Sequence, residues 1–336
     1  MSLKRISSEL GLSLTTVSRA LNGYPEVASA TRDVVFAAAK RLNYRPNANA
    51  RRLALGRTDA IGLVYPISPT DLGDLPFLEV AASMSARLAQ EKIDLLIISA
   101  ASDNELETYQ RAVAARRVDA FVLARTRIHD ARFKLLDAEK VPFIAYGRST
   151  TTQPYSWFDF DNYAGAQLAA RRLLNFGHRR FGYIGAAAHY QFATHRYEGF
   201  KEALHTAGLN LPDSATVRTA LDRRSGYAAM QNLLALPEPP TAVCIDNNLA
   251  GVGAVHALNN AGKVLGRDVS VVVYDGVGTD SIIRTPVTSI MQPTPERAGH
   301  IMADMLVARL RGAAPESQQI LLPQVLEHGT SDGPAP

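Results

Sequence analysis

The sequence predicts an α/β protein with a small all-helical N-terminal part and a larger part made of two doubly wound parallel sheets. Two observations predict this division. Residues 3–42 contain short stretches with helical spacing of apolar residues, broken by glycine and proline. From about residue 59 onward, apolar runs rich in β-branched residues alternate with amphipathic stretches. Such runs are typical of strands buried on both faces, as parallel strands are.

Length and composition indicate an ordinary soluble globular protein. The 336 residues suffice for two or three domains, and 46% of them are hydrophobic and 20% charged. The single cysteine, Cys244, lies in the apolar stretch TAVCIDN, which excludes an internal disulfide and a cysteine metal cluster. The N-terminal MSLKRISSEL has no apolar leader core, and no run approaches a membrane span. We expect a cytoplasmic protein without membrane association, metal or cofactor.

Charge is distributed unevenly along the chain. Residues 1–57 hold ten Lys or Arg and three acidic residues, a net charge of +7, whereas the remaining residues carry a net charge of −3. A basic segment on a mildly acidic body favours a polyanionic partner for that segment, such as nucleic acid. An arginine-rich solvated surface is the alternative.

Three short helices are predicted in this basic segment, over residues 3–10, over residues 14–21 and from residue 29 onward. Gly11 can end the first helix in a left-handed turn, and Ser13 can cap the second. The third helix is expected to bury four apolar residues: Val34, Val35, Ala38 and Leu42. Two short helices joined by a glycine turn and backed by a third form a helix-turn-helix.

The second helix carries short hydroxylated side chains where a surface helix usually carries Glu and Lys. Thr methyl groups can contact thymine methyl groups, hydroxyls can reach base edges or phosphates, and an arginine can bond guanine in the major groove. The residues expected to face DNA are Thr15, Thr16, Ser18 and Arg19. The alternative is that these short side chains only pack a small three-helix domain.

The stretch LNYRPNANARRLALGRT, residues 42–58, predicts one more short helix. A proline stops the third helix, and Asn47 can cap the new one. So short a helix is marginal in isolation, and we expect it to fold against a partner. Arg51 and Arg52 can contact phosphates, and Leu53 is apolar within a basic segment, as a minor-groove wedge would be.

The stretches ISSELGLSLTTVSRALNG and VASATRDVVFAAAKRLNYRPNANARRLALGRT resemble the head and hinge of the lactose-repressor (LacI/GalR) family of transcription regulators, and the rest of the chain fits the same family. The resemblance implies a dimer or tetramer on operator DNA, with recognition helices in adjacent major grooves and hinge helices side by side in the minor groove. It implies base contacts from Leu14, Thr15 and Arg19 and insertion of Leu53 between bases. The polar, glycine- and proline-rich end LLPQVLEHGTSDGPAP indicates a disordered tail without a leucine heptad repeat, which favours the dimer.

Seven apolar runs predict strands in the body: residues 60–67, 94–100, 119–124, 141–147, 180–186, 241–247 and 269–275. This number exceeds one small sheet, so two lobes with a ligand cleft at the carboxyl ends of their strands are expected. That arrangement resembles the periplasmic-binding-protein fold, which the family shares. The predicted boundaries are 1–45 for the head, 46–58 for the hinge helix and linker, and 59–336 for the effector-binding body, with a first subdomain of about 59–160 plus about 288–330 and a second of about 161–287.

Family resemblance also implies three effector-binding positions in the second subdomain. The family's R-x-x-G arginine falls on Arg196 within HRYEGF, and two further positions fall on Asn247 and Asp275. A surface salt bridge is the alternative for Arg196, and a turn cap is the alternative for Asp275. Asn248 stands where the family usually has Asp, so the resemblance does not determine the hydrogen-bond pattern at that strand end.

Candidates in the first subdomain come from strand ends and from the crossover. They are Tyr65, Asp71 and Phe77 after the first strand, Arg125, Arg127 and Arg148 at two later strand ends, and Trp157 and Asp161 at the crossover. Aromatic faces beside charged bidentate groups suit a sugar, although each aromatic can equally belong to the core. The stretches around the three arginines resemble a subset of regulators that responds to α-glucosides and related oligosaccharides.

Enzyme motifs are absent from the sequence: it has no G-x-S-x-G, Walker loop, zinc spacing or strand followed by G-x-G-x-x-G. We therefore predict a non-enzymatic, sequence-specific transcription regulator of carbohydrate uptake or catabolism genes, in the first place a repressor, whose affinity for a partly palindromic operator changes when a small sugar binds. A purine or sugar-phosphate effector, or an activator role, fits the same architecture. A cytosolic sugar-binding or sugar-processing protein with an incidental basic head is the alternative from another class.

Overall fold

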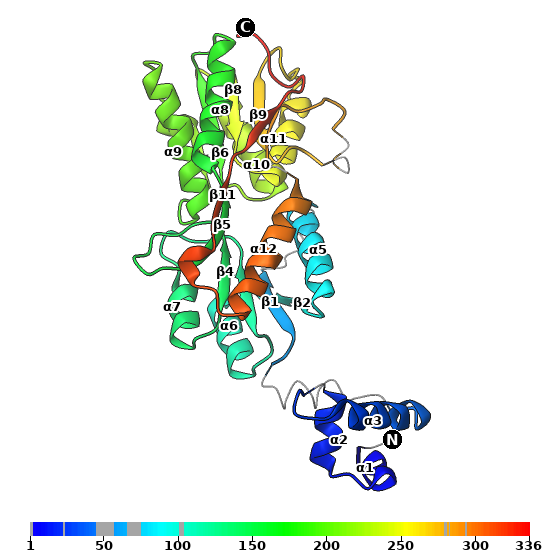
Figure 1. Cartoon of the computed structure of the whole chain (residues 1–336). Helices are drawn as coiled ribbons and strands as arrows, with labels where there is room; N and C mark the ends of the chain where they lie inside the picture. The colour runs from blue at the N-terminus through cyan, green and yellow to red at the C-terminus, as the bar shows by residue number, and fades with distance from the viewer. Residues whose placement is uncertain are drawn as a thin grey trace. The chain divides into compact units, whose positions relative to one another are not determined.

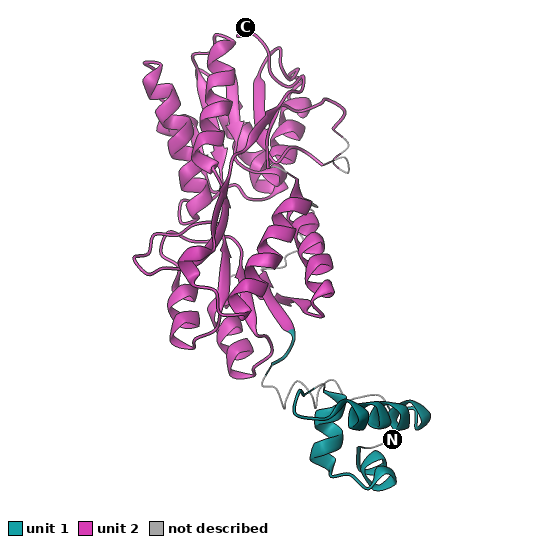
Figure 2. Cartoon of the chain, viewed as in Figure 1, with its two compact units in different colours: residues 1–59 teal, residues 60–336 magenta. Residues whose placement is uncertain are grey.

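The computed structural model describes residues 3–22, 24–44, 57–65, 75–100, 104–278, 281, 283–292 and 294–336 (Figure 1). It divides the chain into two compact units, a head of residues 1–59 and a body of residues 60–336 (Figure 2). In these described ranges no helix is long and apolar enough to cross a membrane.

The head contains the three predicted helices, α1 (Leu3–Leu10), α2 (Leu14–Leu21) and α3 (Ser29–Arg41). Gly11 has a φ of +64° in the turn between α1 and α2, as the glycine prediction requires. The Ser13 hydroxyl accepts a hydrogen bond from the Thr16 backbone N–H at 3.0 Å, which confirms the predicted cap of α2.

The core of the head is formed by one face of each helix. Its buried side chains are Ile6, Val17, Ala20, Val27, Val35, Ala38 and Ala39. The prediction for Val34 was wrong, because that side chain is 52% exposed. Val34 and Val35 are adjacent on α3 and cannot both face inward, so Ala39 takes the position on the buried face.

The first lobe of the body is a parallel sheet in the order β11-β5-β4-β3-β1-β2. Its strands are β1 (Ala60–Tyr65), β2 (Asp94–Ser99), β3 (Ala120–Leu123), β4 (Phe143–Tyr146), β5 (Ser156–Phe160) and β11 (Gln319–Leu322). Helices α5 (Leu75–Gln90) and α12 (Pro295–Leu310) pack together over one face (Figure 1). Helices α6 (Glu105–Ala114) and α7 (Ala131–Ala138) cover the other face. A short turn, η3 (Pro315–Ser317), precedes β11.

The second lobe is a sheet in the order β12-β10-β9-β8-β6-β7, parallel except for the antiparallel β12. Its strands are β6 (Phe181–Gly185), β7 (Thr216–Arg218), β8 (Ala242–Ile245), β9 (Ser270–Tyr274), β10 (Ser289–Met291) and β12 (Val325–Glu327). Helices α8 (Asn162–Asn175) and α9 (Gln191–Thr206) cover one face, and α10 (Arg223–Leu234) and α11 (Asn248–Asn260) cover the other. A short turn, η1 (Asp213–Ala215), precedes β7.

The chain passes between the two sheets after β5, after β10 and after β11. All seven predicted strands are present, and the parallel order confirms the doubly wound fold class. The prediction that assigned residues 288–330 to the first lobe was wrong at both ends, because β10 and β12 belong to the second sheet. Only α12 and β11 of that segment pack on the first lobe.

The C-terminal tail was wrongly predicted to be disordered. It lies on the second lobe, where Ser331, Asp332 and Gly333 make hydrogen bonds to residues distant in sequence. The Ser331 hydroxyl donates to the Val271 carbonyl at 2.7 Å, and the Arg172 Nε donates to Asp332 Oδ2 at 2.6 Å. The polar groups of these three residues therefore have hydrogen-bond partners within the protein.

His178 is buried against this tail and forms a hydrogen bond with it. Its ring nitrogens lie 2.9 Å from Thr241 Oγ1, 2.9 Å from Ser270 Oγ and 3.0 Å from the Gly333 carbonyl oxygen. Because a carbonyl only accepts, the neutral imidazole carries its proton on Nε2. Burial lowers the pKa of His178, against the opposing effects of the Gly333 carbonyl and the Asp332 charge.

This lowered pKa predicts acid sensitivity of the body. Unfolded His178 titrates near 6.5, and below that pH the unfolded chain binds a proton that the folded protein binds less readily. The free energy of unfolding should therefore fall as the pH drops from about 6.5 toward the lower folded pKa, and His178 should have no effect above that range. Urea unfolding at pH 7.5, 6 and 5 measures this dependence. A His178→Gln variant should show a smaller loss between pH 7.5 and 5, and an unchanged loss would contradict the role assigned to His178.

Candidate functional site

The second helix of the head presents the residues that were predicted to meet DNA. Leu14, Thr15 and Arg19 are exposed, while Thr16 and Ser18 are half-buried at the flanks of α2. Val17 and Ala20 face the core instead, so one face of the helix holds the fold and the other remains available. The Arg19 guanidinium lies 3.7 Å from Glu26 Oε1 in a solvent-exposed pair, which contributes little to stability.

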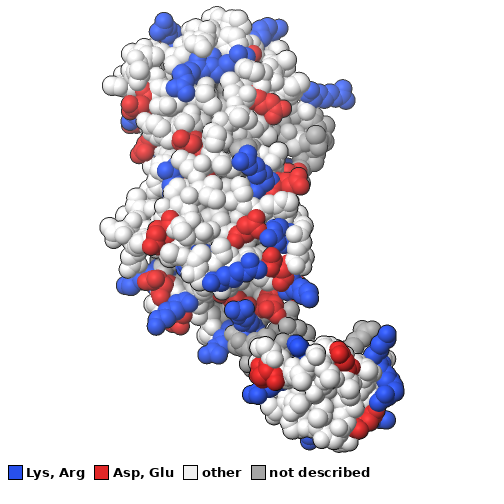
Figure 3. All heavy atoms as spheres, viewed as in Figure 1, with Lys and Arg blue, Asp and Glu red and all other residues white. Residues whose placement is uncertain are grey.

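Charge differs between the two units. Residues 1–57 carry a net charge of +7 and the remaining residues −3; Figure 3 shows Lys and Arg side chains gathered along one edge of the head, with a few acidic side chains on its visible face, and both signs interspersed over the body. The other residues predicted to contact DNA lie outside the described residues: Asn47, Arg51, Arg52 and Leu53.

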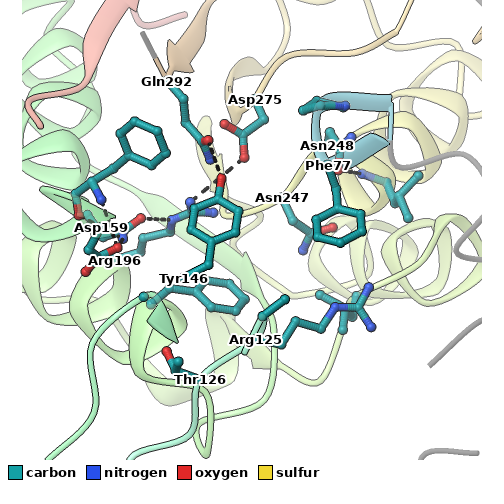
Figure 4. A pocket seen from close by; sticks show the side chains of 18 of the residues that line it. Phe77, Arg125, Thr126, Tyr146, Asp159, Arg196, Asn247, Asn248, Asp275 and Gln292 are labelled. Carbon is teal, nitrogen blue, oxygen red and sulfur yellow. Dashed lines mark hydrogen bonds and ion pairs between the residues drawn. The ribbon is translucent and has the colours of Figure 1, made fainter. Parts of the chain in front are cut away.

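A cavity lies between the two lobes of the body, at the carboxyl ends of strands from both sheets (Figure 4). Among the described residues it is lined by Tyr65, Pro76, Phe77, Ala124, Arg125, Thr126, Tyr146, Gly147, Asp159, Phe160, Asn162, Phe192, Arg196, Leu221, Asn247, Asn248, Leu249, Asp275 and Gln292. Six of the predicted effector-binding residues are in this set: Tyr65, Phe77, Arg125, Arg196, Asn247 and Asp275.

Arg196 is the most strongly held of these side chains. Its residue is 5% exposed, its Nε donates to Asn162 Oδ1 at 2.7 Å, and its Nη1 donates to the Asp246 carbonyl oxygen. Its Nη2 lies 3.9 Å from Asp275 Oδ2, and its guanidinium lies 4.0 Å from the Tyr274 ring centroid. This arrangement fixes a planar cation with donors toward the cavity.

The charge of Arg196 is maintained despite burial. Burial alone would lower the pKa of its guanidinium, but Asp275 and the neighbouring groups raise that pKa above its ordinary value. The position of Arg196 also depends on Gly199, one turn later in α9. A Cβ atom at Gly199 would lie 2.2 Å from the Tyr163 carbonyl oxygen, so glycine is required for α9 to pack against α8.

The opposite wall of the cavity is aromatic. Tyr65 stacks on Phe77 with ring centroids 4.2 Å apart and an interplanar angle of 14°. The Arg125 guanidinium lies 4.6 Å from the Tyr65 centroid, and its Nη2 donates to the Tyr65 hydroxyl at 2.7 Å. Flat apolar rings beside a bidentate cation can bind a hydroxylated ring through its face and its edge.

Arg125 and Asp275 share an uncommon backbone conformation. Each follows the end of a strand, and each has a positive φ, of 51° at Arg125 and 60° at Asp275. Non-glycine residues rarely adopt this region, and where they do the conformation often belongs to a functional site. Both residues line the cavity, one from each lobe.

Asn247 has a structural role at the cavity wall. Its Oδ1 accepts from the Ala250 backbone N–H at 2.8 Å, which caps α11, and its Nδ2 donates to the Ala220 carbonyl oxygen at 2.9 Å. Asn248 also lines the cavity, where its Oδ1 accepts from the Leu249 backbone N–H at 2.9 Å. An Asn at 248 thus keeps an acceptor where the family usually has a carboxylate.

Four other predicted residues do not line the cavity: Arg127, Arg148, Trp157 and Asp161. Arg127 pairs with Glu105 at 2.6 Å and lines a neighbouring cavity, which shares Tyr65, Ala124 and Arg125 with the first. Arg148 donates to Asp159 at 2.8 Å, and its guanidinium lies 5.7 Å from the ring centroid of Trp157.

Trp157 packs against the core on the α6–α7 side of the first sheet. Its neighbour in β5, Phe158, faces the α5–α12 side, because successive residues of a strand point to opposite faces. Asp161 caps α8 by accepting from the Ala164 backbone N–H at 3.0 Å. Asp71 lies outside the described residues.

Several lining residues were not predicted. Tyr146 donates from its hydroxyl to Gln292 Oε1 at 3.0 Å, and Asn162 receives the Arg196 Nε bond. Asp159, by contrast, stands at the crossover that the sequence singled out, beside Trp157 and Asp161, and it lines the cavity, where burial raises the pKa of its carboxyl group against the effect of Arg148. Gln292 and Asn162 lie where the chain passes between the sheets, so the crossover positions were the signal that could have identified them.

Two family models match the chain. Residues 2–47 match the model for "Bacterial regulatory proteins, lacI family", and residues 58–327 match the model for "Periplasmic binding proteins and sugar binding domain of LacI family". The chain belongs to the LacI family. Its LacI head holds the exposed α2 face, and its periplasmic-binding-protein-like body holds the cavity.

The relatives of this LacI-family chain are transcription regulators. The HTH-type transcriptional regulator RafR of Escherichia coli is 41% identical over 98% of this chain and 98% of its own length. The HTH-type transcriptional regulator AglR of Rhizobium meliloti is 39% identical over 82% of this chain and 78% of its own. A solved structure described as a transcriptional regulator CelR–cellobiose complex is 30% identical, covers 98% of this chain and 99% of its own, and has a TM-score of 0.75. This chain is accordingly a DNA-binding transcription regulator of the LacI family.

Proposed function

We propose that this chain is a repressor of carbohydrate uptake or catabolism genes whose affinity for a partly palindromic operator changes when a sugar binds between the two lobes. The observation that carries the proposal is the cavity itself, where the Tyr65–Phe77 stack faces the Arg196–Asp275 pair in a chain with a helix-turn-helix head. Stacking rings opposite bidentate polar groups match the apolar faces and paired hydroxyls of a sugar. The likeness to a regulator solved with cellobiose supports the same ligand class.

Six residues are proposed to bind the effector: Tyr65, Phe77, Arg125, Arg196, Asn247 and Asp275. A ligand that contacts Arg125 in the first lobe and Arg196 in the second stabilises one relative position of the lobes. The lobes also meet directly, because the Ile128 N–H donates to the His189 carbonyl at 2.9 Å and the Gln191 N–H donates to the Thr126 carbonyl at 3.0 Å. Ligand-dependent adjustment of this contact would change the free energy of folding the hinge, residues 46–58, on DNA.

The proposal assigns DNA contacts to the exposed face of α2 and to the hinge residues Asn47, Arg51, Arg52 and Leu53. We also propose that the chain acts as a homodimer in the cytoplasm, since the two-fold symmetry of a dimer matches that of a partly palindromic operator. A non-enzymatic role is included because the named relatives are regulators.

Operator binding and ligand binding can be tested together. Fluorescence anisotropy with DNA from upstream of the chain's own gene should show saturable, salt-dependent binding, and a thermal-shift panel of sugars should raise the melting temperature with at least one sugar. Stabilisation by sugar without any specific DNA binding would favour a sugar-binding or sugar-processing protein. Stabilisation by purines or phosphorylated sugars alone would replace the proposed effector class.

Replacement of Arg19 by alanine should weaken operator binding by about 1–3 kcal/mol and relax the preference at one base position, because an arginine on α2 can make a bidentate contact to guanine. Anisotropy titrations with the operator, with single-base variants and with random DNA measure both effects. An Arg52→Ala variant is the control, since loss of a phosphate contact should weaken all sequences about equally. Equal losses on operator and random DNA for Arg19→Ala would remove it from the base-contacting set.

A further inference from the structure

Four charged side chains of the first lobe form a cluster next to the cavity, where α6 and α7 begin. This buried charge cluster consists of Glu105, Arg127, Asp130 and Arg132. The side chains of Glu105, Asp130 and Arg132 are 9%, 0% and 2% exposed. Two cations balance two carboxylates, as buried charges require.

Arg132 is the centre of the cluster and uses its guanidinium fully. Its Nε and Nη2 donate to the two Asp130 carboxylate oxygens at 2.8 and 2.6 Å, and its Nη1 donates to Glu105 Oε1 at 2.7 Å. Nη1 also donates to the Ala124 carbonyl at 3.0 Å, and Nη2 donates to the Arg125 carbonyl at 3.3 Å. Arg132 therefore connects the start of α7 to two cavity-lining residues, including Arg125 with its positive φ.

The cluster also fixes the segment that meets the second lobe. Asp130 Oδ2 accepts from the Arg127 backbone N–H at 3.1 Å, and Glu105 Oε2 accepts from Arg127 Nη2 at 2.6 Å. Residues 126–128 pair antiparallel with residues 189–191 of the second lobe, through a bridge at Arg127 and the two backbone hydrogen bonds given above. We call this pairing the inter-lobe ladder.

The inter-lobe ladder ends at the helix that carries Arg196. Gln191, whose N–H donates to the Thr126 carbonyl, is the first residue of α9, and Arg196 lies further along the same helix. Figure 4 shows the side chains of these segments around one cavity, Arg125 and Thr126 from the first lobe and Arg196 from the second. A shift of residues 124–128 would therefore move Arg125 and also the start of α9.

We propose that Arg132, together with Asp130 and Glu105, is a positioning residue that keeps the inter-lobe ladder in register and so transmits the effect of a bound ligand from one lobe to the other. Asp130 and Arg132 line neither the cavity nor its neighbour, so both act through residues 124–128. The inference rests on the proposed effector response and names the residues on which that response depends.

Hydrogen exchange tests the ladder without any sugar. We expect Arg132→Lys to speed exchange about tenfold in peptides that contain Ile128 and Gln191, because lysine keeps the charge but lacks the guanidinium fork. Mass spectrometry of the full chain measures this rate. Arg172→Lys is the matched control: Arg172 also donates its Nε to a buried carboxylate, that of Asp332, but in the second lobe. It should leave exchange in the same peptides unchanged.

A second variant removes the buried pair without leaving an unpaired charge. Asp130→Asn combined with Arg132→Met deletes one charge of each sign, and asparagine can still cap α7. This variant should also speed exchange at Ile128 and Gln191. Wild-type exchange in both variants would overturn the inference. Equally accelerated exchange throughout the body would overturn it too, because the cluster would then serve overall stability and not the ladder.

The effector response gives the functional readout. Cellobiose, maltose, melibiose and raffinose are compared on the wild type, and the sugar that stabilises it most is used at a concentration that calorimetry shows to be saturating. We expect this sugar to change the operator dissociation constant at least threefold less in Arg132→Lys than in the wild type or in Arg172→Lys. A full wild-type response in Arg132→Lys would contradict the inference. A wild type that binds operator and responds to no sugar would contradict the proposed function instead, and the hydrogen-exchange result would still decide the role of the cluster.

Discussion

A protein truncated to begin at Thr58 should lose all measurable operator binding and still bind its sugar. Residues 1–57 carry a net charge of +7 and the remaining residues −3, so the truncation removes the attraction for phosphates together with the α2 face. The body forms its own compact unit, with hydrophobic cores on both faces of each sheet, and is expected to fold without the head. Anisotropy with operator DNA and calorimetry with the best sugar measure the two activities separately.

Salt dependence supplies the control for this truncation. For the full chain, the logarithm of the binding constant should fall linearly with the logarithm of salt concentration, with a slope of about −0.9 for each phosphate neutralised. Operator binding by the truncated protein that equals full-chain binding would show that the body, and not the head, contacts DNA.

Replacement of Arg196 by alanine should abolish the effect of sugar on operator binding and leave operator binding itself. The variant loses a buried cation with bonds to Asn162 and Asp246 and a 3.9 Å pair with Asp275, and it removes donors from the cavity wall. Loss of a hydrogen bond to a charged group costs about 1.5–3 kcal/mol, which corresponds to roughly ten- to hundredfold weaker sugar binding. Calorimetry with sugar and anisotropy with operator measure the two effects.

Stability must be separated from binding in this experiment, because removal of one partner of a buried ion pair is itself destabilising. Arg172→Ala is the matched control. Arg172 pairs with buried Asp332 at 2.6 Å and does not line the cavity between the lobes. It should lower the melting temperature and keep the affinity for sugar. The milder Asp275→Asn variant should lose sugar affinity with less loss of stability. Wild-type affinity in both Arg196→Ala and Asp275→Asn would remove these residues from the effector site.

The elements that could be predicted from the sequence are those with a long periodic or apolar signal. Strands such as β1, β8 and β9 are fully buried, so their apolar runs stand out against the flanking helices. β7, β10 and β12 span three residues each, too few for any period to be detected, and β11 is an edge strand with alternating exposure. The assignment of β10 and β12 to the second lobe depends on long-range pairing, which local pattern does not encode.

At the site, the positions of the strand ends could be predicted from the sequence, but not whether each side chain faces the cavity. Alternation in β5 requires Trp157 and Phe158 to face opposite sides, yet the sequence alone does not decide which side is the cavity side. Arg148 was predicted at the cavity from its strand end, but it does not line the cavity and donates instead to Asp159, which does. The tail was misjudged because its hydrogen-bond partners, Arg172 and Ser270 among them, lie more than sixty residues away in sequence.

The coupling of the two units is tested most directly by operator affinity at zero and at saturating concentration of the tightest-binding neutral sugar, with calorimetry on the same sample to show that the sugar is bound. We expect the operator dissociation constant to change by about fivefold or more, the lower end of typical allosteric coupling, and the sugar affinity to change by the same factor when operator is present. The Arg196→Ala variant should show no change. An operator dissociation constant that is identical with and without bound sugar would contradict the proposal that the cavity controls the head.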